Sequence, residues 1–390
     1  MQPSRPEPLP ALTSLRFFAA ALVILFHYLP RNETNTAWYL NVINHGYVGV
    51  SFFFVLSGFI LAYTGRQADF TIQKTRLTFY ARRIARVFPA FFIATLLQWP
   101  LFANYEHATL SPHDSLVRVL LVTCLTFALV QSWFPWSLGQ LNAPSWTISV
   151  EMFLYASFPL AATMARKLKP KTILLSGLLC WSLCWLPAAA APWVSQWFLA
   201  DASVPTWLHS PFSVASTWLN CFPLFHLPQF CIGIFAGTWV VRPTNGREAD
   251  VRSGIAAIVA VLTALLLLAV PRKQFALLDM ALNHGVLALC FATLFSAIAI
   301  VPDAAWQQPL KWRPLVILGD ASYALYIFQM PVMQATTLVF KKMGSSTESL
   351  SLFITGFMVL IGVSLISWKL EPWARSRLYH RLERTFLQKA

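Results

Sequence analysis

Charged residues are scarce in this chain. Only 11% of its 390 residues are Asp, Glu, Lys or Arg, whereas 57% are hydrophobic. Soluble globular proteins carry about 25% charged residues, and this sequence instead has many apolar runs long enough to cross a bilayer. Polar stretches long enough to build a separate soluble core are missing as well. We therefore expect an all-α polytopic integral membrane protein, a single domain over residues 1–390 with a short cytoplasmic tail over 373–390.

Patterned cysteines are also missing. The six cysteines are scattered through apolar stretches, and the close pair Cys180 and Cys184 is one helical turn apart. This spacing lacks the paired ligands of a zinc site and the context of a disulfide framework. We expect neither disulfides nor a bound metal.

The chain has few acidic residues, because 29 Lys and Arg face only 15 Asp and Glu. The basic residues cluster in short segments between the apolar runs, as in cytoplasmic loops under the positive-inside rule. We therefore expect contact with membrane lipids and no binding of nucleic acid.

What the sequence does contain is a series of apolar runs of about twenty residues. Eleven candidates lie near 12–30, 47–65, 87–103, 115–133, 146–164, 172–190, 221–241, 253–270, 281–301, 314–339 and 350–370. The first run contains Arg16 and ends without a small-residue cleavage site, so we expect it to remain as a membrane helix rather than a signal peptide.

Three basic segments orient these runs. They are the stretch from Arg66 to Arg86, the stretch 166–171 and the tail after Trp373, and all three are expected in the cytoplasm. The three candidates between the first two segments cannot all cross under that constraint.

We expect the candidate near 115–133 to be re-entrant or to lie on the surface, because the uncharged run that contains it is broken by WFPW and NAPSW. Ten crossings then remain, and both termini are cytoplasmic.

Arg16 and His27 share the first apolar run and lie eleven residues apart. On a helix they project from one face, about 16 Å apart along the axis. Ionisable groups at bilayer depth usually face a protein interior, so the pair is a candidate functional site. The alternative is that Arg16 snorkels to the headgroups and His27 is a packing residue.

Glu151 lies in the outer half of the run near 146–164, at a depth similar to that of His27 in this topology. Thr147 and Tyr155 lie one turn to either side on the same face. A carboxylate beside an imidazole fixes its tautomer and raises its basicity, as a general base requires. A structural pair between two helices is the alternative.

Arg82, Arg83 and Arg86 come just before the expected helix over 87–103. Such a cluster beside a helix N-terminus can hold phosphates through bidentate contacts and the helix dipole. It can equally be a topology signal or a headgroup contact. The second run contains small residues, among them Ser57 and Gly58, that permit close helix packing.

Together these segments resemble acyltransferase family 3, the bacterial membrane O-acyltransferases. The resemblance spans nearly the whole chain and rests on Arg16 with His27, GVSFFFVLSGF, RRIARVFP, PSWTISVE, LPQFCIGIFAG, GDASYALYIFQMP and LEPWARSRL. It implies a ten-helix core in the bacterial cytoplasmic (inner) membrane and a cytoplasmic acyl-CoA donor, by default acetyl-CoA.

The resemblance also implies roles for particular residues. Arg82, Arg83 and Arg86 would grip the donor phosphates, while the thioester arm passes between the first two helices, where Ser57 and Gly58 are counted as donor-binding residues. Arg16 would steady the donor. His27 would act as base on the acceptor hydroxyl or carry the acyl group, with Glu151 orienting it.

The same resemblance places Trp146, Tyr323 and Gln329 in the acceptor pocket. Ser57, Tyr323 and Gln329 are candidates for the oxyanion donor. Gln329 stands where many relatives have a histidine, which puts a protonation role at that position in doubt.

The acceptor implied is a hydroxyl of a surface or extracellular glycan, such as an exopolysaccharide, an O-antigen or a lipid-linked sugar. A small molecule such as a macrolide is the alternative, and glycan-assembly proteins are candidate partners. A glycan or lipid transporter is the rival from another class. It would leave the arginine cluster without a particular role, and no similar halves are evident in the sequence.

Overall fold

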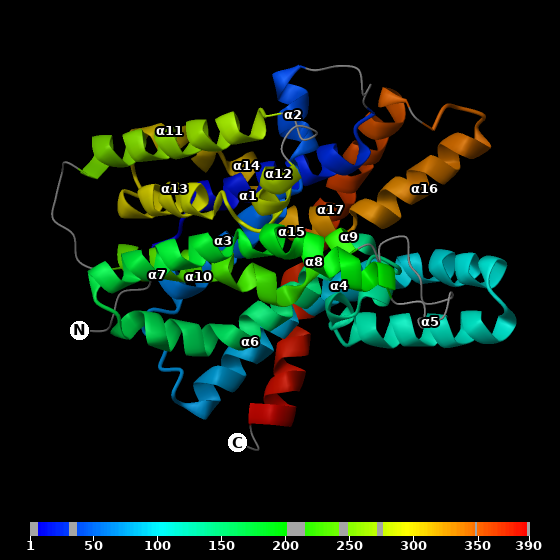
Figure 1. Ribbon diagram of the computed structural model, residues 1–390, viewed down its shortest axis with the longest axis horizontal. Coiled ribbons are helices and arrows are strands. Elements are labelled where there is room, and N and C mark those ends of the chain that lie inside the picture. Colours follow the sequence, from blue (N-terminus) through cyan, green and yellow to red (C-terminus); the bar gives the residue numbers. More distant parts are fainter. Residues whose placement is uncertain are drawn as a thin grey trace. The chain divides into compact units, whose positions relative to one another are not determined.

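A computed structural model describes residues 7–30, 37–200, 215–241, 249–270, 276–347 and 349–387. Throughout these ranges the chain forms helices and no β-strand (Figure 1), which confirms the all-α expectation. It divides into two compact units. Unit 1 comprises Met1–Arg76, Ser157–Leu186 and His226–Ser322, and unit 2 comprises Leu77–Ala156, Pro187–Phe225 and Tyr323–Ala390.

Unit 1 contains the first apolar run and the helices that pack around it. Its elements are α1 (Pro10–Tyr28), α2 (Trp38–Asn44), α3 (Val48–Thr64), α7 (Pro170–Leu183), most of α10 (Pro223–Val240), α11 (Ala249–Leu268), α12 (Ala276–Asn283), α13 (Ala288–Ile300), η6 (Ala305–Lys311), α14 (Arg313–Asp320) and the second half of α6 (Trp146–Lys167).

Helix α1 is held tightly by its neighbours in unit 1. It begins at Pro10, a residue well suited to the first turn because that turn needs no N–H donor. The Ser14 hydroxyl donates to the Leu310 carbonyl over 2.5 Å. A Cβ at Gly319 would lie 1.9 Å from the Thr13 carbonyl oxygen, so only glycine allows α14 to approach α1 this closely.

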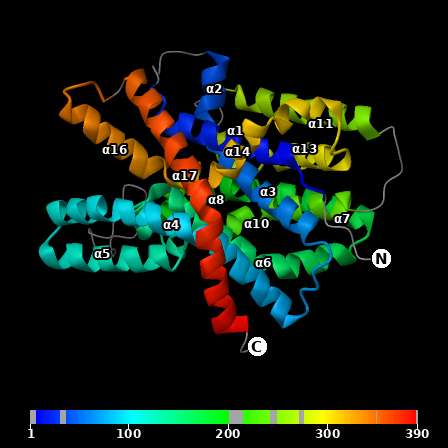
Figure 2. The ribbon, with the colours of Figure 1, turned by 180° about the vertical axis from the view of Figure 1, so that it is seen from behind.

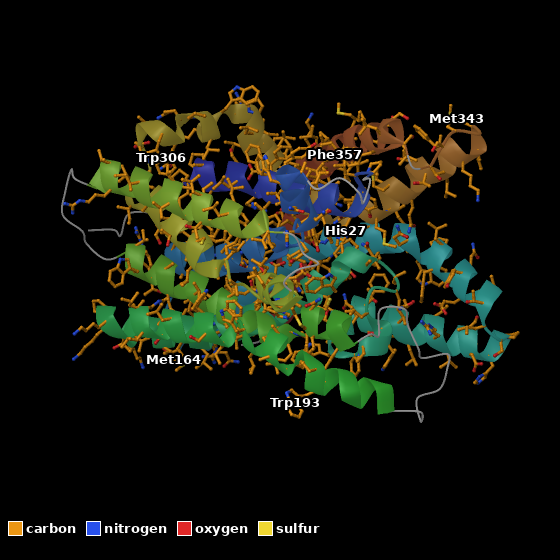
Figure 3. The ribbon with its side chains drawn as sticks, turned by 45° about the horizontal axis from the view of Figure 1, so that its top comes forward. His27, Met164, Trp193, Trp306, Met343 and Phe357 are labelled. Carbon is orange, nitrogen blue, oxygen red and sulfur yellow. The ribbon has the colours of Figure 1, made fainter. Side chains whose placement is uncertain are left out.

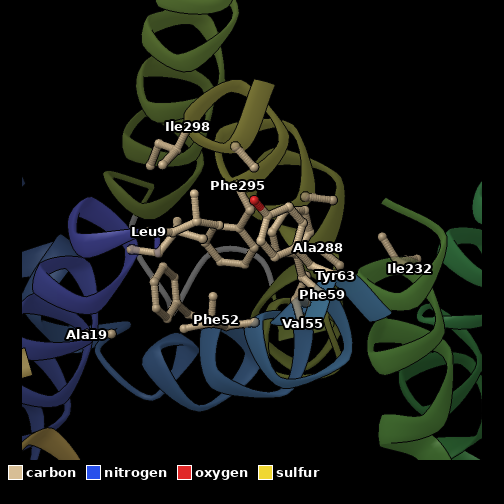
Figure 4. Packing of buried hydrophobic residues seen from close by; sticks show 14 of the residues in the cluster. Leu9, Ala19, Phe52, Val55, Phe59, Tyr63, Ile232, Ala288, Phe295 and Ile298 are labelled. Atoms are coloured by element: carbon tan, nitrogen blue, oxygen red, sulfur yellow. The ribbon is translucent and has the colours of Figure 1, made fainter. Parts of the chain in front are cut away.

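An aromatic cluster fills the core of unit 1 (Figure 4). Phe59 of α3 meets Phe295 of α13 edge to face, with ring centroids 5.7 Å apart, and Phe295 also meets Phe52 at 5.0 Å. Lipid tails are as apolar as these side chains, so close packing stabilises such a core more than exclusion of water does.

Unit 2 contains the long helices that flank the expected arginine cluster. Its elements are most of α4 (Gln73–Thr109), α5 (Pro112–Phe127), the short 3-10 turns η1 (Gln131–Trp133), η2 (Pro135–Ser137) and η3 (Ala143–Ser145), the first half of α6, most of α8 (Leu186–Ala200), α9 (Ala215–Cys221), most of α15 (Ser322–Ile327), α16 (Gln329–Lys342), α17 (Leu350–Leu382) and the π-helical turn η7 (Glu383–Leu387).

Helices α4 and α5 form a hairpin in unit 2, in which they lie side by side in both views (Figures 1 and 2). The Ser111 hydroxyl accepts a hydrogen bond from the Asp114 N–H and so caps the start of α5. Glu106 of α4 and Arg118 of α5 form a buried ion pair with 3.1 Å between Oε2 and Nε. Helices α16 and α17 of this unit also pack against each other.

Among the described residues, seven helices are long and apolar enough to cross a membrane, and the bent pair α2 and α3 raises the number to eight if it is one span. This confirms a polytopic membrane protein and does not confirm the expected count of ten. Apolar side chains on the outside agree with a lipid environment: Met164, Trp193 and Met343 are 60, 71 and 72% exposed (Figure 3).

Two of the expected crossings, those near 221–241 and 314–339, do not form such helices. The first corresponds to α10, an 18-residue helix that contains His226, Pro228 and Gln229 and is therefore less apolar than the candidate spans. The second is divided into α14, α15 and α16, with breaks at Ala321 and Phe328. The segment near 115–133 corresponds to α5 and is also not among the candidate spans, so its re-entrant or surface position stays a prediction.

The helices at two expected boundaries are longer than predicted. Helix α4 begins at Gln73 rather than near residue 87, and α17 continues to Leu382, through much of the expected tail over 373–390. Apolar content marks the part of a helix that can lie in lipid, whereas the helix itself continues into water for as long as its backbone bonds are made.

Candidate active site

The predicted pair Arg16 and His27 lies on one helix, as expected. Both residues belong to α1, Arg16 is half-buried and His27 in the last turn is exposed. The His27 ring lies 4.9 Å from the Phe26 ring and 5.9 Å from the Tyr28 ring, centroid to centroid. Figure 3 labels His27. An exposed imidazole on a rigid helix is accessible to a reacting group.

A polar cluster that the sequence analysis missed lies near the same end of α1. The Phe26 ring packs against Tyr47, with centroids 5.6 Å apart. The Tyr47 hydroxyl donates to the Asp279 carboxylate over 2.6 Å, and Nε2 of the buried His45 lies 3.7 Å from the same carboxylate. Residues 45 and 279 are far apart in the sequence, so no local pattern could have indicated this cluster.

Ser57 and Gly58, the predicted donor-binding residues of the second run, lie on α3 in unit 1. Ser57 is half-buried. A Cβ at Gly58 would lie 2.2 Å from the carbonyl oxygen of Phe230 on α10, and one at Gly233 would lie 2.1 Å from the Val55 carbonyl oxygen. Gly58 therefore serves the contact between α3 and α10, and donor binding by Gly58 stays a prediction.

Unit 2 joins Glu151 to the arginine cluster. The Tyr155 hydroxyl donates a hydrogen bond to the Glu151 carboxylate, which confirms that these residues share a helix face. The guanidinium carbon of Arg83 lies 5.9 Å from the Tyr155 ring centroid and 5.7 Å from the Phe79 ring centroid. Arg83 also interacts electrostatically with Glu151, Arg86 and Arg375.

The three arginines are not equivalent. Arg82 is exposed and lies over the Tyr379 ring at 5.9 Å, whereas the Nε atom of Arg83 is buried and has no hydrogen-bond partner in the described part of the chain. The expected helix dipole at this cluster is wrong, because α4 begins at Gln73 and places all three arginines well inside the helix.

The predicted acceptor residues lie in unit 2 with this network. The Tyr323 hydroxyl donates to the Val87 carbonyl over 2.7 Å, and Tyr323 interacts electrostatically with Glu151. Trp146 begins α6, and its carbonyl accepts a hydrogen bond from Ser132 over 2.8 Å. Nε2 of Gln329 donates to the Tyr326 carbonyl over 2.8 Å.

The structure thus brings Arg83, Arg86, Glu151 and Tyr323 together within unit 2, and places Arg16, His27, Ser57 and Gly58 in unit 1. The sequence analysis missed Arg375 and Glu371 of α17, which join the unit 2 network from more than 200 positions further along the chain. Both lie in the segment LEPWARSRL, which contributed to the family resemblance but carried no indication of which residues it contacts.

In the ranges that the structure describes, no group of three or more His, Cys, Asp or Glu residues is arranged to hold a metal ion. A cavity of about 260 Å³ in unit 1 has apolar walls from α1, α3, α11 and α13, and none of the predicted site residues lines it.

Comparison with known proteins defines the class of this chain. The family model of the acyltransferase domain matches residues 9–369, in keeping with the helical membrane fold. The chain belongs to this family of membrane O-acyltransferases. No solved structure is significantly similar to it.

Two relatives show how far the similarity extends. The chain is 28% identical over 349 residues to the acyltransferase MdmB of Streptomyces mycarofaciens, which covers 85% of this chain and 81% of MdmB. It is 26% identical over 336 residues to the O-acetyltransferase OatA of Staphylococcus aureus strain NCTC 8325, which covers 84% of this chain and 51% of OatA. The chain thus spans about half the length of OatA.

Proposed function

We propose that this protein transfers an acyl group, most simply acetyl, from cytoplasmic acyl-CoA to a hydroxyl group of a surface or extracellular glycan. Membership of the acyltransferase family supports the reaction class, and the name of the relative OatA supports acetyl and oxygen as the group and the acceptor atom. The glycan acceptor and the acyl-CoA donor are our proposal.

The observation that carries the proposal is the environment of Arg83. Its guanidinium carbon lies over both the Phe79 and Tyr155 rings, 5.7 and 5.9 Å from their centroids, and its buried Nε atom has no hydrogen-bond partner among the residues described. Aromatic rings hold a guanidinium in place while its N–H donors stay available. Arg83, with Arg86 beside it, is therefore suited to bind an anion such as the phosphates of CoA.

In the proposed reaction, Arg16 steadies the donor and His27 takes the proton of the acceptor hydroxyl. The hydroxyl oxygen attacks the thioester carbonyl carbon, the carbon–sulfur bond breaks, and the CoA thiolate leaves and takes up a proton. Glu151, whose carboxylate is fixed by the Tyr155 hydroxyl, orients the imidazole. In the variant with an acyl-imidazole intermediate, His27 is first the nucleophile, and trapping an acylated His27 distinguishes the two routes.

The proposal also includes the location. The protein would lie in the bacterial cytoplasmic membrane with both termini in the cytoplasm, so the donor is bound on the inner side. The basic segments around Arg83 and after Trp373 support this orientation. The test fuses to each terminus a reporter enzyme that is active only outside the cytoplasm. Activity of either fusion would contradict this orientation.

The decisive experiment measures CoA release from labelled acetyl-CoA by the purified protein in lipid, with and without a panel of glycans. Glycan-dependent release by the wild type and its loss in His27→Ala are expected. If the wild type neither releases CoA nor binds acetyl-CoA, the hypothesis of a glycan or lipid transporter is favoured over that of an acyltransferase. Release with a macrolide and with none of the glycans would change the acceptor class.

Binding measurements separate the roles of the candidates. Arg83→Ala should weaken acetyl-CoA binding about tenfold, because it removes charge-assisted hydrogen bonds. His27→Ala should leave binding within about twofold while abolishing turnover. Arg82→Ala, which changes the exposed neighbouring arginine, is the matched control and should weaken acetyl-CoA binding less than Arg83→Ala does. Equal loss of binding in Arg83→Ala and His27→Ala contradicts this division of roles.

The rate should also follow the protonation of His27. An imidazole accepts a proton only when it is neutral, so transfer should slow as the pH falls through the pKa of this residue. A rate that stays constant from about pH 5 to 8, with the chemical step shown to be limiting, contradicts a base at this position.

A further inference from the structure

Three buried amide side chains of unit 2 surround the turn η3, which leads directly into Trp146. Gln131, Asn142 and Gln329 are 2%, 1% and 0% exposed. Gln131 begins η1, Asn142 directly precedes η3, and Gln329 begins α16, which packs against η3. Three polar side chains from separate segments therefore meet around one turn.

The hydrogen bonds of these amides fix which way each side chain faces. Nε2 of Gln131 donates to the Ser145 carbonyl over 2.9 Å, and Nδ2 of Asn142 lies 3.4 Å from the Ile327 carbonyl. Nε2 of Gln329 donates to the Tyr326 carbonyl over 2.8 Å. A backbone carbonyl oxygen can only accept a hydrogen bond, so the NH₂ end of each amide must face it and the oxygen end must face elsewhere.

The oxygen ends have no partner. Oε1 of Gln131, Oδ1 of Asn142 and Oε1 of Gln329 are all buried and none has a hydrogen bond within the described part of the chain. Leaving a buried acceptor unpaired is destabilising, so each such oxygen requires an explanation. Burial of a glutamine does not by itself produce the feature, since Gln307 of unit 1 is 1% exposed and leaves no such atom. Gln229 of unit 1 is buried and also has an unpaired Oε1, but among the described residues only around η3 do three such amides come together.

The chemistry of the oxygens defines what they can bind. All three are neutral hydrogen-bond acceptors, so an organic ligand that they hold presents several O–H or N–H donors. Phosphate and thioester oxygens are acceptors themselves, which excludes those parts of acyl-CoA from these atoms. A sugar ring carries several hydroxyl groups, whereas a mostly apolar alcohol presents one.

We infer that Gln131, Asn142 and Gln329 form a subsite that holds the non-reacting hydroxyl groups of a polyhydroxylated acceptor. The inference rests on the proposed function and narrows its acceptor to a sugar. It also adds a role for the Gln329 side chain, whose buried unpaired oxygen is a hydrogen-bond acceptor. The sugar would contact η3 next to Trp146, an aromatic residue suited to stacking on a sugar ring.

The test compares Gln131→Met and Gln329→Met with the wild type in the purified full chain in lipid. Methionine keeps most of the volume and removes the oxygen. Gln307→Met makes the same chemical change at a glutamine outside the subsite and is the matched control. The probes are acetyl-CoA as donor and, as acceptors, methyl α-D-glucopyranoside, methyl N-acetyl-β-D-glucosaminide, their monodeoxy analogues and 1-hexanol.

Each subsite variant should raise the KM for the sugar about tenfold, because one hydrogen bond to a hydroxyl is lost. In these variants the KM for acetyl-CoA should stay within about twofold of the wild-type value. In Gln307→Met the KM values for the sugar and for acetyl-CoA should both stay within about twofold of the wild-type values. With the wild type, a monodeoxy sugar that lacks the bound hydroxyl should have a KM about tenfold higher than the parent sugar. With the matching variant the two sugars should have similar KM values, since the same contact is already gone.

Other outcomes overturn the inference. Equal increases in the two KM values, or no change in either, would show that the amides only support the fold. Turnover with 1-hexanol and with none of the sugars would remove the sugar subsite and leave acyl transfer intact. Loss of activity when choline replaces Na⁺ and K⁺ would assign the oxygens to a cation. Absence of both turnover and acetyl-CoA binding in the wild type would instead refute the proposed function.

Discussion

The contact between α3 and α10 in unit 1 and the contact between α4 and α5 in unit 2 hold helices together by opposite means. The first has no side chain at its closest points, where Gly58 and Gly233 bring the two backbones together. The second contains the buried ion pair of Glu106 and Arg118 and a hydrogen bond from Trp99 Nε1 to the Thr123 hydroxyl over 3.1 Å.

The difference reflects what lipid can and cannot do for a helix pair. Lipid tails fill any gap between apolar helices, so α3 and α10 gain mainly from close dispersion contacts, which small residues permit. A charge in lipid has no such substitute, so the Glu106 carboxylate requires Arg118 at a specific place. The stability of the glycine contact therefore depends on how closely the two backbones fit. The stability of the ionic contact depends on the presence of the oppositely charged side chain.

The largest effect should come from removing one partner of the ion pair. Glu106→Ala leaves the Arg118 charge buried without its carboxylate and should lower the free energy of unfolding by about 3–5 kcal/mol. The measurement is unfolding of the purified protein in lipid bicelles. The double variant Glu106→Leu with Arg118→Leu should be more stable than Glu106→Ala, because no charge is left unpaired. If the double variant is the less stable one, the pair itself contributes more than burial of the charges costs.

A smaller loss should follow from adding one methyl group to the glycine contact. A Cβ at Gly233 would lie 2.1 Å from the Val55 carbonyl oxygen, so Gly233→Ala forces the helices apart and should lower the free energy of unfolding by about 1–3 kcal/mol. Gly177 of α7 has nothing within 4 Å of its Cβ position, so Gly177→Ala is the matched control and should be neutral or stabilising. Similar losses in both variants would refute shape as the cause.

The smallest of the three effects should come from the hydrogen bond between Trp99 and Thr123. Thr123→Val keeps the shape of the side chain and removes the acceptor, so the free energy of unfolding should fall by about 0.6 kcal/mol, the typical value for such bonds in membrane proteins. Combining Thr123→Val with Trp99→Phe should add little further loss. A loss well above that of Gly233→Ala would show that neutral polar contacts, and not only charges, dominate this hairpin.

The candidate site could be predicted from the sequence where its residues share one helix. Arg16 and His27 lie on α1, and Glu151 and Tyr155 lie on one face of α6, because a helical period of 3.6 residues fixes both relations. Contacts between distant segments could not be predicted. Asp279 beside Tyr47 and Arg375 near Arg83 depend on how helices pack, and a single sequence carries no signal of that.

The scarcity of charge and the apolar runs of about twenty residues determined that this protein is helical and lies in a membrane, since a run of that length crosses the hydrocarbon core as a helix. Motif spacing determined which side chains share a helix face. Only the tertiary structure decided that the Nε atom of Arg83 is buried while Arg82 is exposed. It also decided that Gln131, Asn142 and Gln329 present oxygens around one turn that have no partner among the described residues. Burial depends on the neighbours that a side chain meets, and those neighbours come from remote parts of the chain.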